Sequence, residues 1–331
     1  MVVGDLVVRK SYGKDITFKI IDQYENEDGE MIFILKGVNL RIEADSIEAD
    51  LEVVTEKNNS KADIIFNKRI NDSIKRVLAE RDPYQDVQEV FANKSKQNKK
   101  SKSSKSKNKS SRVDYSRSES FLEDRGKNNK EGGELVLDKK LVFGRPGRIL
   151  HIDGDPDYLQ VCLKTYKELL IDAVGVAIAE NEQPDRILEL VREIKPDIVV
   201  LTGHDGMLKK TGDEVLNLDN YRNSKHFVET VRKLRIYQPS YDELVIFAGA
   251  CQSCYEALLD AGANFASSPN RVLIHCLDPV LVCEKIAYTN IEKFVAIEDV
   301  IKNTITGIKG VGGMQTRGKY REGFPKSQYL K

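Results

Sequence analysis

Short apolar runs alternate with amphipathic stretches along the C-terminal part of the chain. Runs rich in Val, Ile and Leu that end in Gly-containing turns are typical of strands buried on both faces of a parallel sheet. Such strands are predicted in GRILHIDGD, VGVAIAE, PDIVVLTG, LVIFAGA and NRVLIHCLDP. Apolar residues at helical spacing predict helices over Pro156–Leu170, Pro184–Ile194, Tyr221–Leu234, Cys254–Asp260 and Pro279–Tyr288. This alternation predicts an α/β fold, with a parallel sheet and helices on both of its faces.

The first 55 residues show a different pattern and predict a small β domain of SH3-like size. β-branched residues dominate four short segments, which are separated by turn sequences such as SYGKD and ENEDGE. These predicted strands are Asp5–Arg9, Thr17–Ile21, Met31–Leu35 and Leu51–Val54. Residues 56–92 follow as a highly charged segment, with a helical pattern from Ile64 to Ala92.

Residues 93–134 form a predicted disordered linker before the α/β domain of residues 135–331. Eight lysines and no acidic residue lie between Lys94 and Lys109, among Ser, Asn and Gln. With no apolar residue to offset the entropy of ordering, this stretch is expected to be unstructured. A polybasic arm for nucleic acid is one interpretation. A solvated tether is favoured, because no aromatic residues are interleaved with the lysines, and no nucleic-acid partner is expected.

Composition excludes several classes of protein. The 331 residues contain 52 Lys and Arg against 52 Asp and Glu, so net charge indicates no polyanionic partner. No apolar run approaches the roughly 18 residues of a membrane span, and the N-terminus does not resemble a signal peptide. Five cysteines, an odd number, lie within strand-like and helix-like runs. They indicate a reducing, cytoplasmic compartment.

Two predicted strands end in reactive side chains. PDIVVLTGHDG leads to His204, and ELVIFAGACQS leads to Cys251. Functional groups of parallel sheets gather at the carboxyl ends of strands, so the two strands are predicted to be adjacent and parallel. A thiolate that attacks and an imidazole that carries the proton are the minimum for thiol nucleophilic catalysis. A helix predicted just after Cys251 is expected to lower the pKa of its thiol.

Other histidines and cysteines leave alternatives open. His151 lies near the end of a neighbouring strand and is the second choice for the base, whereas His275 is expected in the core and His226 on a solvated helix. Cys251 and Cys254 form a CxxC pair, which suggests a thiol-redox protein as an alternative. A zinc site would need the adjacent pair His275 and Cys276, an unusual spacing, so no metal is expected.

The start of the α/β domain resembles a receiver domain of response regulators. In GRILHIDGDPDYL, Asp153 and Asp155 match the acidic pair of that family, which holds a magnesium ion. The phospho-acceptor position at the end of PDIVVL is Thr202, which removes the group to be phosphorylated. A non-enzymatic, degenerate-receiver regulatory module is therefore a further alternative.

A second resemblance is more extensive. An apolar block ending in His, followed by one ending in Ala-Cys, resembles caspase-like cysteine peptidases, in which these residues end adjacent parallel strands. TGHDG, FAGACQS, NRVLIHCLDP and the closing GIKGVGGMQTRGKYREGFP resemble the YabG family of sporulation-specific peptidases, as does the small N-terminal β domain. The resemblance implies a caspase-like cysteine endopeptidase that cleaves spore-coat and cortex-related proteins after basic residues. It also implies a location in the mother-cell cytoplasm of a sporulating bacterium, associated with the spore coat.

The resemblance also assigns roles to individual residues. Cys251 is the expected nucleophile and His204 the expected base, with no cofactor. Caspase-like peptidases have Gly directly after His, but here Asp205 intervenes before Gly206. The expected oxyanion donors are the backbone N–H of Cys251 and that of Asp205 or Gly206. A pocket for a basic residue needs a carboxylate, for which Asp278 and Asp205 are the candidates. The Lys-rich linker, with its arginines, is an expected site of self-cleavage.

Overall fold

The structure, a computed structural model, describes residues 1–54, 61–81, 142–208 and 214–327. The predicted linker of residues 93–134 lies outside these ranges. The strands are Leu6–Arg9 (β1), Thr17–Glu25 (β2), Met31–Gly37 (β3), Glu43–Ile47 (β4), Leu51–Val53 (β5), Phe143–Arg145 (β6), Ile149–Asp153 (β7), Ala173–Ala177 (β8), Ile198–Thr202 (β9), Val245–Ala248 (β10), Phe265–Ser267 (β11), Phe294–Val295 (β12), Val311–Gly313 (β13), Thr316–Arg317 (β14) and Arg321–Gly323 (β15). The helices are Lys61–Glu80 (α1), Pro156–Glu168 (α3), Gln183–Ile194 (α4), Ser224–Tyr237 (α5), Tyr255–Asp260 (α6), Asp278–Tyr288 (α7) and Ile297–Asn303 (α8).

A six-stranded sheet forms the centre of the α/β region, in the order β13-β11-β10-β9-β7-β8. Every pair is parallel except β13, which runs antiparallel to β11. The strand before His204 (β9) and the strand before Cys251 (β10) are hydrogen-bonded neighbours, with Leu201 opposite Ala248. The prediction that these two strands are adjacent and parallel is therefore confirmed.

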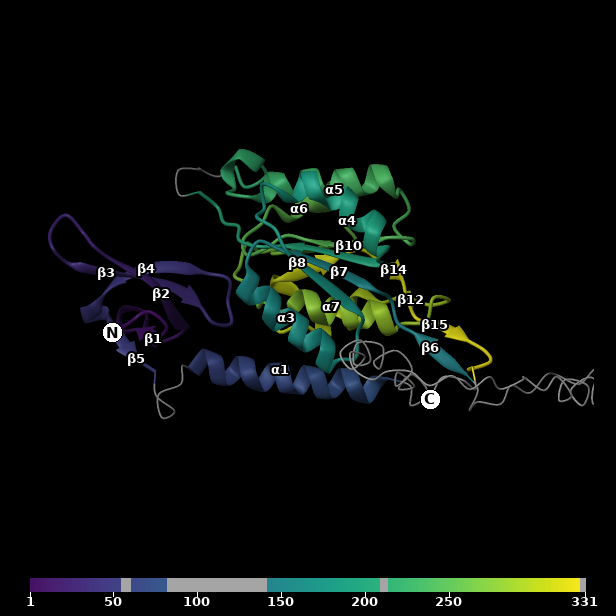
Figure 1. The fold of residues 1–331 in the computed structure, drawn as a ribbon, viewed down its shortest axis with the longest axis horizontal. Coiled ribbons are helices and arrows are strands. Elements are labelled where there is room, and N and C mark those ends of the chain that lie inside the picture. The colour runs from purple at the N-terminus through teal and green to yellow at the C-terminus, as the bar shows by residue number, and fades with distance from the viewer. Residues whose placement is uncertain (55–60, 82–141, 209–213, 328–331) are drawn as a thin grey trace, which may run out of the picture. The chain divides into compact units, whose positions relative to one another are not determined.

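Helices cover both faces of this sheet (Figure 1), α4, α5 and α6 on one face and α3 and α7 on the other. Successive strand residues point to opposite faces. In β9, Ile198 and Val200 belong to the core beneath α3 and α7, whereas Val199 and Leu201 belong to the core beneath α4 and α5. This two-sided burial explains the continuous apolar strands and confirms the predicted α/β class.

The N-terminal region is a five-stranded antiparallel sheet in the order β4-β3-β2-β1-β5. Its small core contains Val7, Phe18, Ile20, Phe33, Leu35 and Leu51. Four of its strands match the predicted segments, and β4 was missed because its sequence EADSI has almost no apolar alternation. Pairing with β3 from Lys36 to Ile32 holds β4 in place.

One predicted strand is wrong. NRVLIHCLDP does not join the sheet, and the place beside β10 is taken by the three-residue strand β11. Its apolar residues Ile274, Cys276 and Leu277 are buried against the sheet, but the segment does not pair with a neighbouring strand of that sheet. Its regular pairing is a single antiparallel bridge between His275 and Leu40, in the loop after β3.

Among the described helices, none combines the length and the apolar composition needed to cross a membrane.

Gly249 follows β10 directly and starts the turn that carries Cys251. Its φ is +104°, and a Cβ there would lie 2.5 Å from Ser267 Oγ and 2.7 Å from Leu258 Cδ1. We expect Gly249→Ala to lower the free energy of unfolding by about 2–4 kcal/mol, from left-handed strain plus overpacking. Gly307→Ala is the matched control, because Gly307 also has positive φ but open space around it, and about 1–2 kcal/mol is expected. Urea unfolding of both variants tests this, and equal losses would contradict the packing argument.

Candidate active site

Three neighbouring strands bring their carboxyl ends to one edge of the sheet. β7 ends at Asp153, β9 ends two residues before His204, and β10 ends three residues before Cys251. Because β9 lies between β7 and β10, the turn that carries His204 emerges between those that carry the other two residues. The sheet register therefore gathers a carboxylate, an imidazole and a thiol at one edge.

The Cys251 thiol is enclosed, with 1% of the residue exposed. Its sulfur accepts a hydrogen bond from the backbone N–H of Ile274 at 3.3 Å. Burial raises the pKa of the thiol to about 11, although backbone hydrogen bonds from Ile274 and Arg41 and the charge of Arg41 act in the opposite direction. The expectation of a lowered pKa is wrong for this arrangement, because α6 begins only at Tyr255 and desolvation dominates.

The turn around Cys251 is fixed by hydrogen bonds to neighbouring strands. Gly249 donates its N–H to Leu201 O at 2.9 Å. Ser267 Oγ donates to Ala250 O at 2.7 Å, and Gln252, with φ of 56°, donates its N–H to Ser268 Oγ at 3.0 Å. These hydrogen bonds from β11 and the loop after it position the turn that carries the Cys251 thiol.

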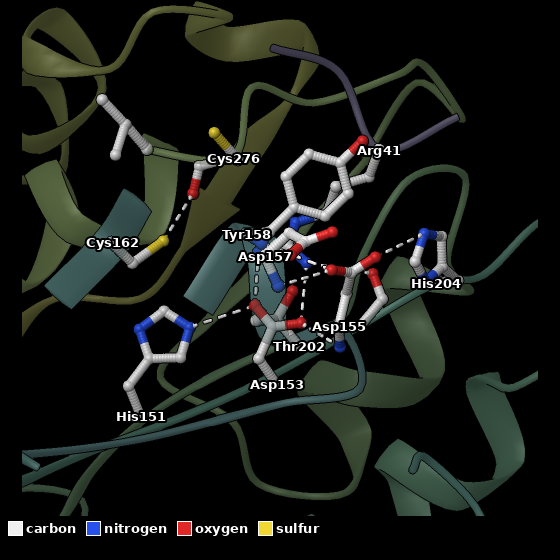
Figure 2. A network of polar contacts seen from close by, with 12 residues as sticks. Arg41, His151, Asp153, Asp155, Asp157, Tyr158, Cys162, Thr202, His204 and Cys276 are labelled. Atoms are coloured by element: carbon white, nitrogen blue, oxygen red, sulfur yellow. Dashed lines mark hydrogen bonds and ion pairs between the residues drawn. The ribbon is translucent and has the colours of Figure 1, made fainter. Parts of the chain in front are cut away.

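The His204 turn is held from the other side by Glu180. The backbone N–H of His204 donates to Glu180 Oε1 at 2.6 Å, and Asn223 Nδ2 donates to His204 O at 2.8 Å. A Cβ at Gly203 would lie 2.1 Å from Glu180 Oε1, so a larger residue there would displace this carboxylate. The His204 side chain is 19% exposed, and its Nε2 lies 3.6 Å from Asp155 Oδ2 (Figure 2). That carboxylate is placed to stabilise a charged imidazolium.

Asp205 joins the His204 turn to the Cys251 turn. Its Oδ1 accepts from the N–H groups of Gly206 at 2.9 Å and Asn223 at 2.8 Å. Its Oδ2 accepts from the hydroxyls of Ser224 and Ser253, the latter at 2.8 Å. Ser253 Oγ in turn accepts from the N–H of Ala250, next to Cys251, at 2.9 Å. This positioning role, in which one carboxylate connects both turns, is not recognisable from local sequence.

Several groups expected to bind the oxyanion or a basic side chain are already hydrogen-bonded within the protein. The N–H of Gly206 is donated to Asp205, and the carboxylate of Asp205 is occupied by four donors. Asp278 is fully buried in the first turn of α7, where it accepts from the N–H groups of His275, Ile305 and Thr306 and from the Thr306 hydroxyl. Burial raises the pKa of Asp278, although these hydrogen bonds act in the opposite direction. Both carboxylates thus bind the chain itself, and their substrate-binding roles stay predictions.

The other carboxylates at this edge pair with cations from the N-terminal sheet. Asp153 is fully buried and binds both terminal nitrogens of Arg41, at 2.8 and 2.6 Å. Asp155 caps α3 through the N–H of Asp157, and it binds Lys36 Nζ at 2.6 Å. In a receiver domain the matching acidic pair holds a metal ion. Here Asp153 holds an arginine and Asp155 holds a lysine. Figure 2 shows Arg41 beside these carboxylates.

The remaining histidines are placed differently from His204. His151 is fully buried within β7, where its Nδ1 lies 3.2 Å from the Tyr166 hydroxyl and its Nε2 lies 3.6 Å from Asp153 Oδ2. Burial lowers its pKa, which keeps the ring neutral. His275 Nδ1 accepts from the N–H of Leu277 at 3.1 Å, and burial lowers the pKa of His275 to about 3. His226 lies half-buried on α5.

All five thiols are free. Within the described ranges, no three His, Cys, Asp or Glu side chains are grouped in a way that could hold a metal ion.

The geometry defines an α/β protein with a cysteine and a histidine on the ends of adjacent parallel strands. Comparison with known proteins adds the family. The profile of the family described as YabG peptidase U57 matches residues 2–325. The chain is also 36% identical over 323 residues to the sporulation-specific protease YabG of Bacillus subtilis (strain 168), covering 98% of this chain and 97% of that protein. The chain belongs to the YabG peptidase family, as the resemblance predicted.

The raised pKa of Cys251 predicts how its alkylation depends on pH. With a pKa of about 11, the thiolate fraction near pH 7 is on the order of a hundredfold smaller than for an unperturbed cysteine. We expect iodoacetamide to modify Cys251 more slowly in the folded protein than after denaturation, at a rate that still rises above pH 9.5. Peptide mass spectrometry at a series of pH values measures this. A plateau near pH 7 would contradict the enclosed, protonated thiol.

Proposed function

We propose that the protein is a cysteine endopeptidase with Cys251 as nucleophile and His204 as general base. The observation that carries this proposal is the pairing of β9 with β10, which sets the two side chains on adjacent strand ends. The network of Asp205 and Ser253 supports it, because it couples the turns that carry them. Two such strand ends in this order are also the arrangement expected of a caspase-like peptidase.

In the proposed reaction, His204 takes the thiol proton and Cys251 Sγ attacks the carbonyl carbon of the scissile peptide bond. His204 then returns the proton to the amine that leaves, and a thioester forms. Water, activated by the same imidazole, hydrolyses the thioester and restores the thiol. Asp155, at 3.6 Å from Nε2, stabilises the imidazolium between these steps. The proposed oxyanion donors are the backbone N–H groups of Cys251 and of the Asp205–Gly206 turn. To donate to the oxyanion, the N–H of Gly206 would first have to break its hydrogen bond with Asp205 Oδ1.

The proposed substrates are spore-coat and cortex-related proteins, cut after basic residues in the mother-cell cytoplasm, where the enzyme associates with the spore coat. The name of the Bacillus subtilis relative, a sporulation-specific protease, supports a role in sporulation. The carboxylates of Asp153 and Asp155 at the same sheet edge support a preference for basic side chains. No cofactor is needed for this chemistry.

Substitution of the two residues tests the mechanism. Cys251→Ala should abolish proteolysis, because it removes the nucleophile, and His204→Ala should reduce turnover about 10²–10⁴-fold through loss of the base. Hydrolysis of a protein substrate and of arginine-terminated peptides measures both effects. Circular dichroism and thermal unfolding establish that the variants are folded.

Cys254→Ala and His226→Ala are matched controls for the same two residue types and should retain activity. Activity retained by Cys251→Ala would rule out the mechanism. Loss of activity only in Cys254→Ala, with thiol–disulfide exchange in the wild type, would favour the redox alternative.

Self-cleavage in the linker is a second test of the proposal. The segment carries Arg112, Arg117 and Arg125 and many lysines. A segment of the same chain is present at high effective concentration. Incubated wild-type protein should give new termini between about residues 94 and 130, an interval that follows the predicted linker, whereas Cys251→Ala stays intact. Equal cleavage of both proteins would indicate a contaminating protease.

A further inference from the structure

The loop between β3 and β4 reaches the candidate active site. This loop, residues 38–42, carries Arg41, which is 2% exposed overall and has a fully buried side chain. Arg41 lies between the end of β7, through Asp153, and the turn before His204, through a contact of Nη1 with Gly203 O at 3.5 Å. The N-terminal sheet thus places a guanidinium among the residues proposed for catalysis.

The surroundings of Arg41 form a pocket suited to a guanidinium. Asp153 binds both terminal nitrogens, the two-pronged geometry that arginine forms and lysine cannot. The Tyr158 ring lies 4.8 Å from the guanidinium carbon, a distance suited to a cation–π interaction (Figure 2). Burial would raise the pKa of Asp153, but the charge of Arg41 and the hydrogen bonds from His151 and Arg41 hold that pKa well below its usual range.

The backbone of the loop binds as a peptide ligand would. Leu40 forms an antiparallel bridge with His275, and Asn39 O accepts from the N–H of Cys276 at 3.2 Å. Main-chain pairing of this kind gives affinity for extended peptides, while side-chain pockets give specificity. The charge and the backbone of Arg41 both lower the pKa of the Cys251 thiol, although the effect of burial is larger.

We propose that Asp153 and Tyr158 form the subsite for the arginine side chain of a substrate, and that Arg41 fills this subsite as an internal pseudosubstrate. The proposal rests on the proposed peptidase function. A substrate arginine must displace Arg41 before it can bind, so the loop is a competitive inhibitor carried by the chain.

The chain bends away immediately after Arg41, which sets the loop apart from a substrate. Ile42 donates its N–H to Leu40 O at 2.9 Å, a hydrogen bond across two residues as in a γ-turn. Gly37 donates its N–H to Ile42 O at 2.8 Å, which closes the loop on itself. A Cβ at Gly37 would lie 2.3 Å from Leu40 O, so the tight loop requires glycine. The peptide bond after Arg41 is therefore held in a turn rather than extended across the thiol.

Tyr158 locks the loop through its hydroxyl as well as its ring. The hydroxyl donates to Leu40 O at 2.8 Å and also contacts Gly37 O. Lys36, at the end of β3, binds Asp155 and Asp157 at 2.6 and 2.8 Å. In this proposal, the closed loop contributes to the 1% exposure of Cys251, and this burial raises the pKa of its thiol.

Ligand binding to inactive protein tests the subsite without relying on catalysis. In the Cys251→Ala background, Arg41→Ala empties the subsite. Nα-acetyl-arginine amide should then raise the Tm as its concentration increases, because it binds the native state. Nα-acetyl-citrulline amide, which is uncharged, should not. The shift should be much smaller with Arg41 in place, and it should disappear when Asp153→Asn is added.

Two outcomes of this binding experiment would overturn the proposal. One is an Arg41→Ala protein that is folded by circular dichroism yet shows no arginine-dependent shift. The other is a shift that Asp153→Asn leaves unchanged.

Tyr158→Phe supplies a second measurement with Arg41 and Asp153 intact. It keeps the ring over the guanidinium but removes the hydroxyl that holds the loop. The KM for arginine-terminated peptides should fall about fivefold, as expected from weakening the closed state by one or two hydrogen bonds. Tyr166→Phe is the control, since Tyr166 bonds His151 and does not hold the loop, and its KM should match the wild type.

An unchanged or raised KM in Tyr158→Phe would overturn the pseudosubstrate. If the wild type hydrolyses no peptide, the proposed function fails, and the binding experiment still decides whether the pocket recognises arginine.

Discussion

The ion pair between Arg41 and Asp153 is the interaction on which the described state of the site depends. Neither side chain of the pair is exposed, and burial of two charges is costly unless they meet with good geometry. The two-pronged contact satisfies this condition and joins the loop after β3 to the end of β7. Burial is what raises the pKa of the Cys251 thiol, and the charge of Arg41 acts in the opposite direction.

The parallel sheet supplies the second constraint, since it fixes which strand ends are neighbours. Its register sets the His204 turn between those of Asp153 and Cys251. Hydrogen bonds from Glu180 and Asp205 then hold the turns themselves. A rigid scaffold with polar support behind each turn is what preorganised catalysis requires. In the proposed peptidase, the sheet would keep nucleophile and base in place while the loop alone has to move.

The elements of the fold that could be predicted from sequence are those with strong periodicity. β7, β9 and β10 are continuous apolar runs, and α3, α4 and α7 begin near prolines, so each is recognisable from local pattern. The strands β4 and β11 could not be predicted from sequence, because β4 is mostly polar and β11 has only three residues. NRVLIHCLDP has the apolar pattern of a strand because several of its residues are buried against the sheet.

The site residues show where local pattern stops being informative. Cys251 and His204 could be chosen because both follow strands, and Asp205 and Asp278 were chosen as pocket carboxylates by position alone. The structure shows those two carboxylates engaged by neighbouring N–H and hydroxyl groups. Arg41 and Asp153 are 112 residues apart, and nothing in the local sequence of either indicates the other. A contact of this kind depends on tertiary packing, which cannot be predicted from the local pattern of a single sequence.

Cys251 is proposed as the nucleophile of a peptidase that recognises basic residues. The most direct measurement is labelling with an arginine acyloxymethylketone probe, followed by mass spectrometry of the modified peptide. The account predicts one modified residue, Cys251, with labelling much weaker in His204→Ala and in the presence of excess arginine peptide. Modification of Cys254 or another cysteine instead, or hydrolysis of peptides by protein whose Cys251 is not labelled, would contradict it.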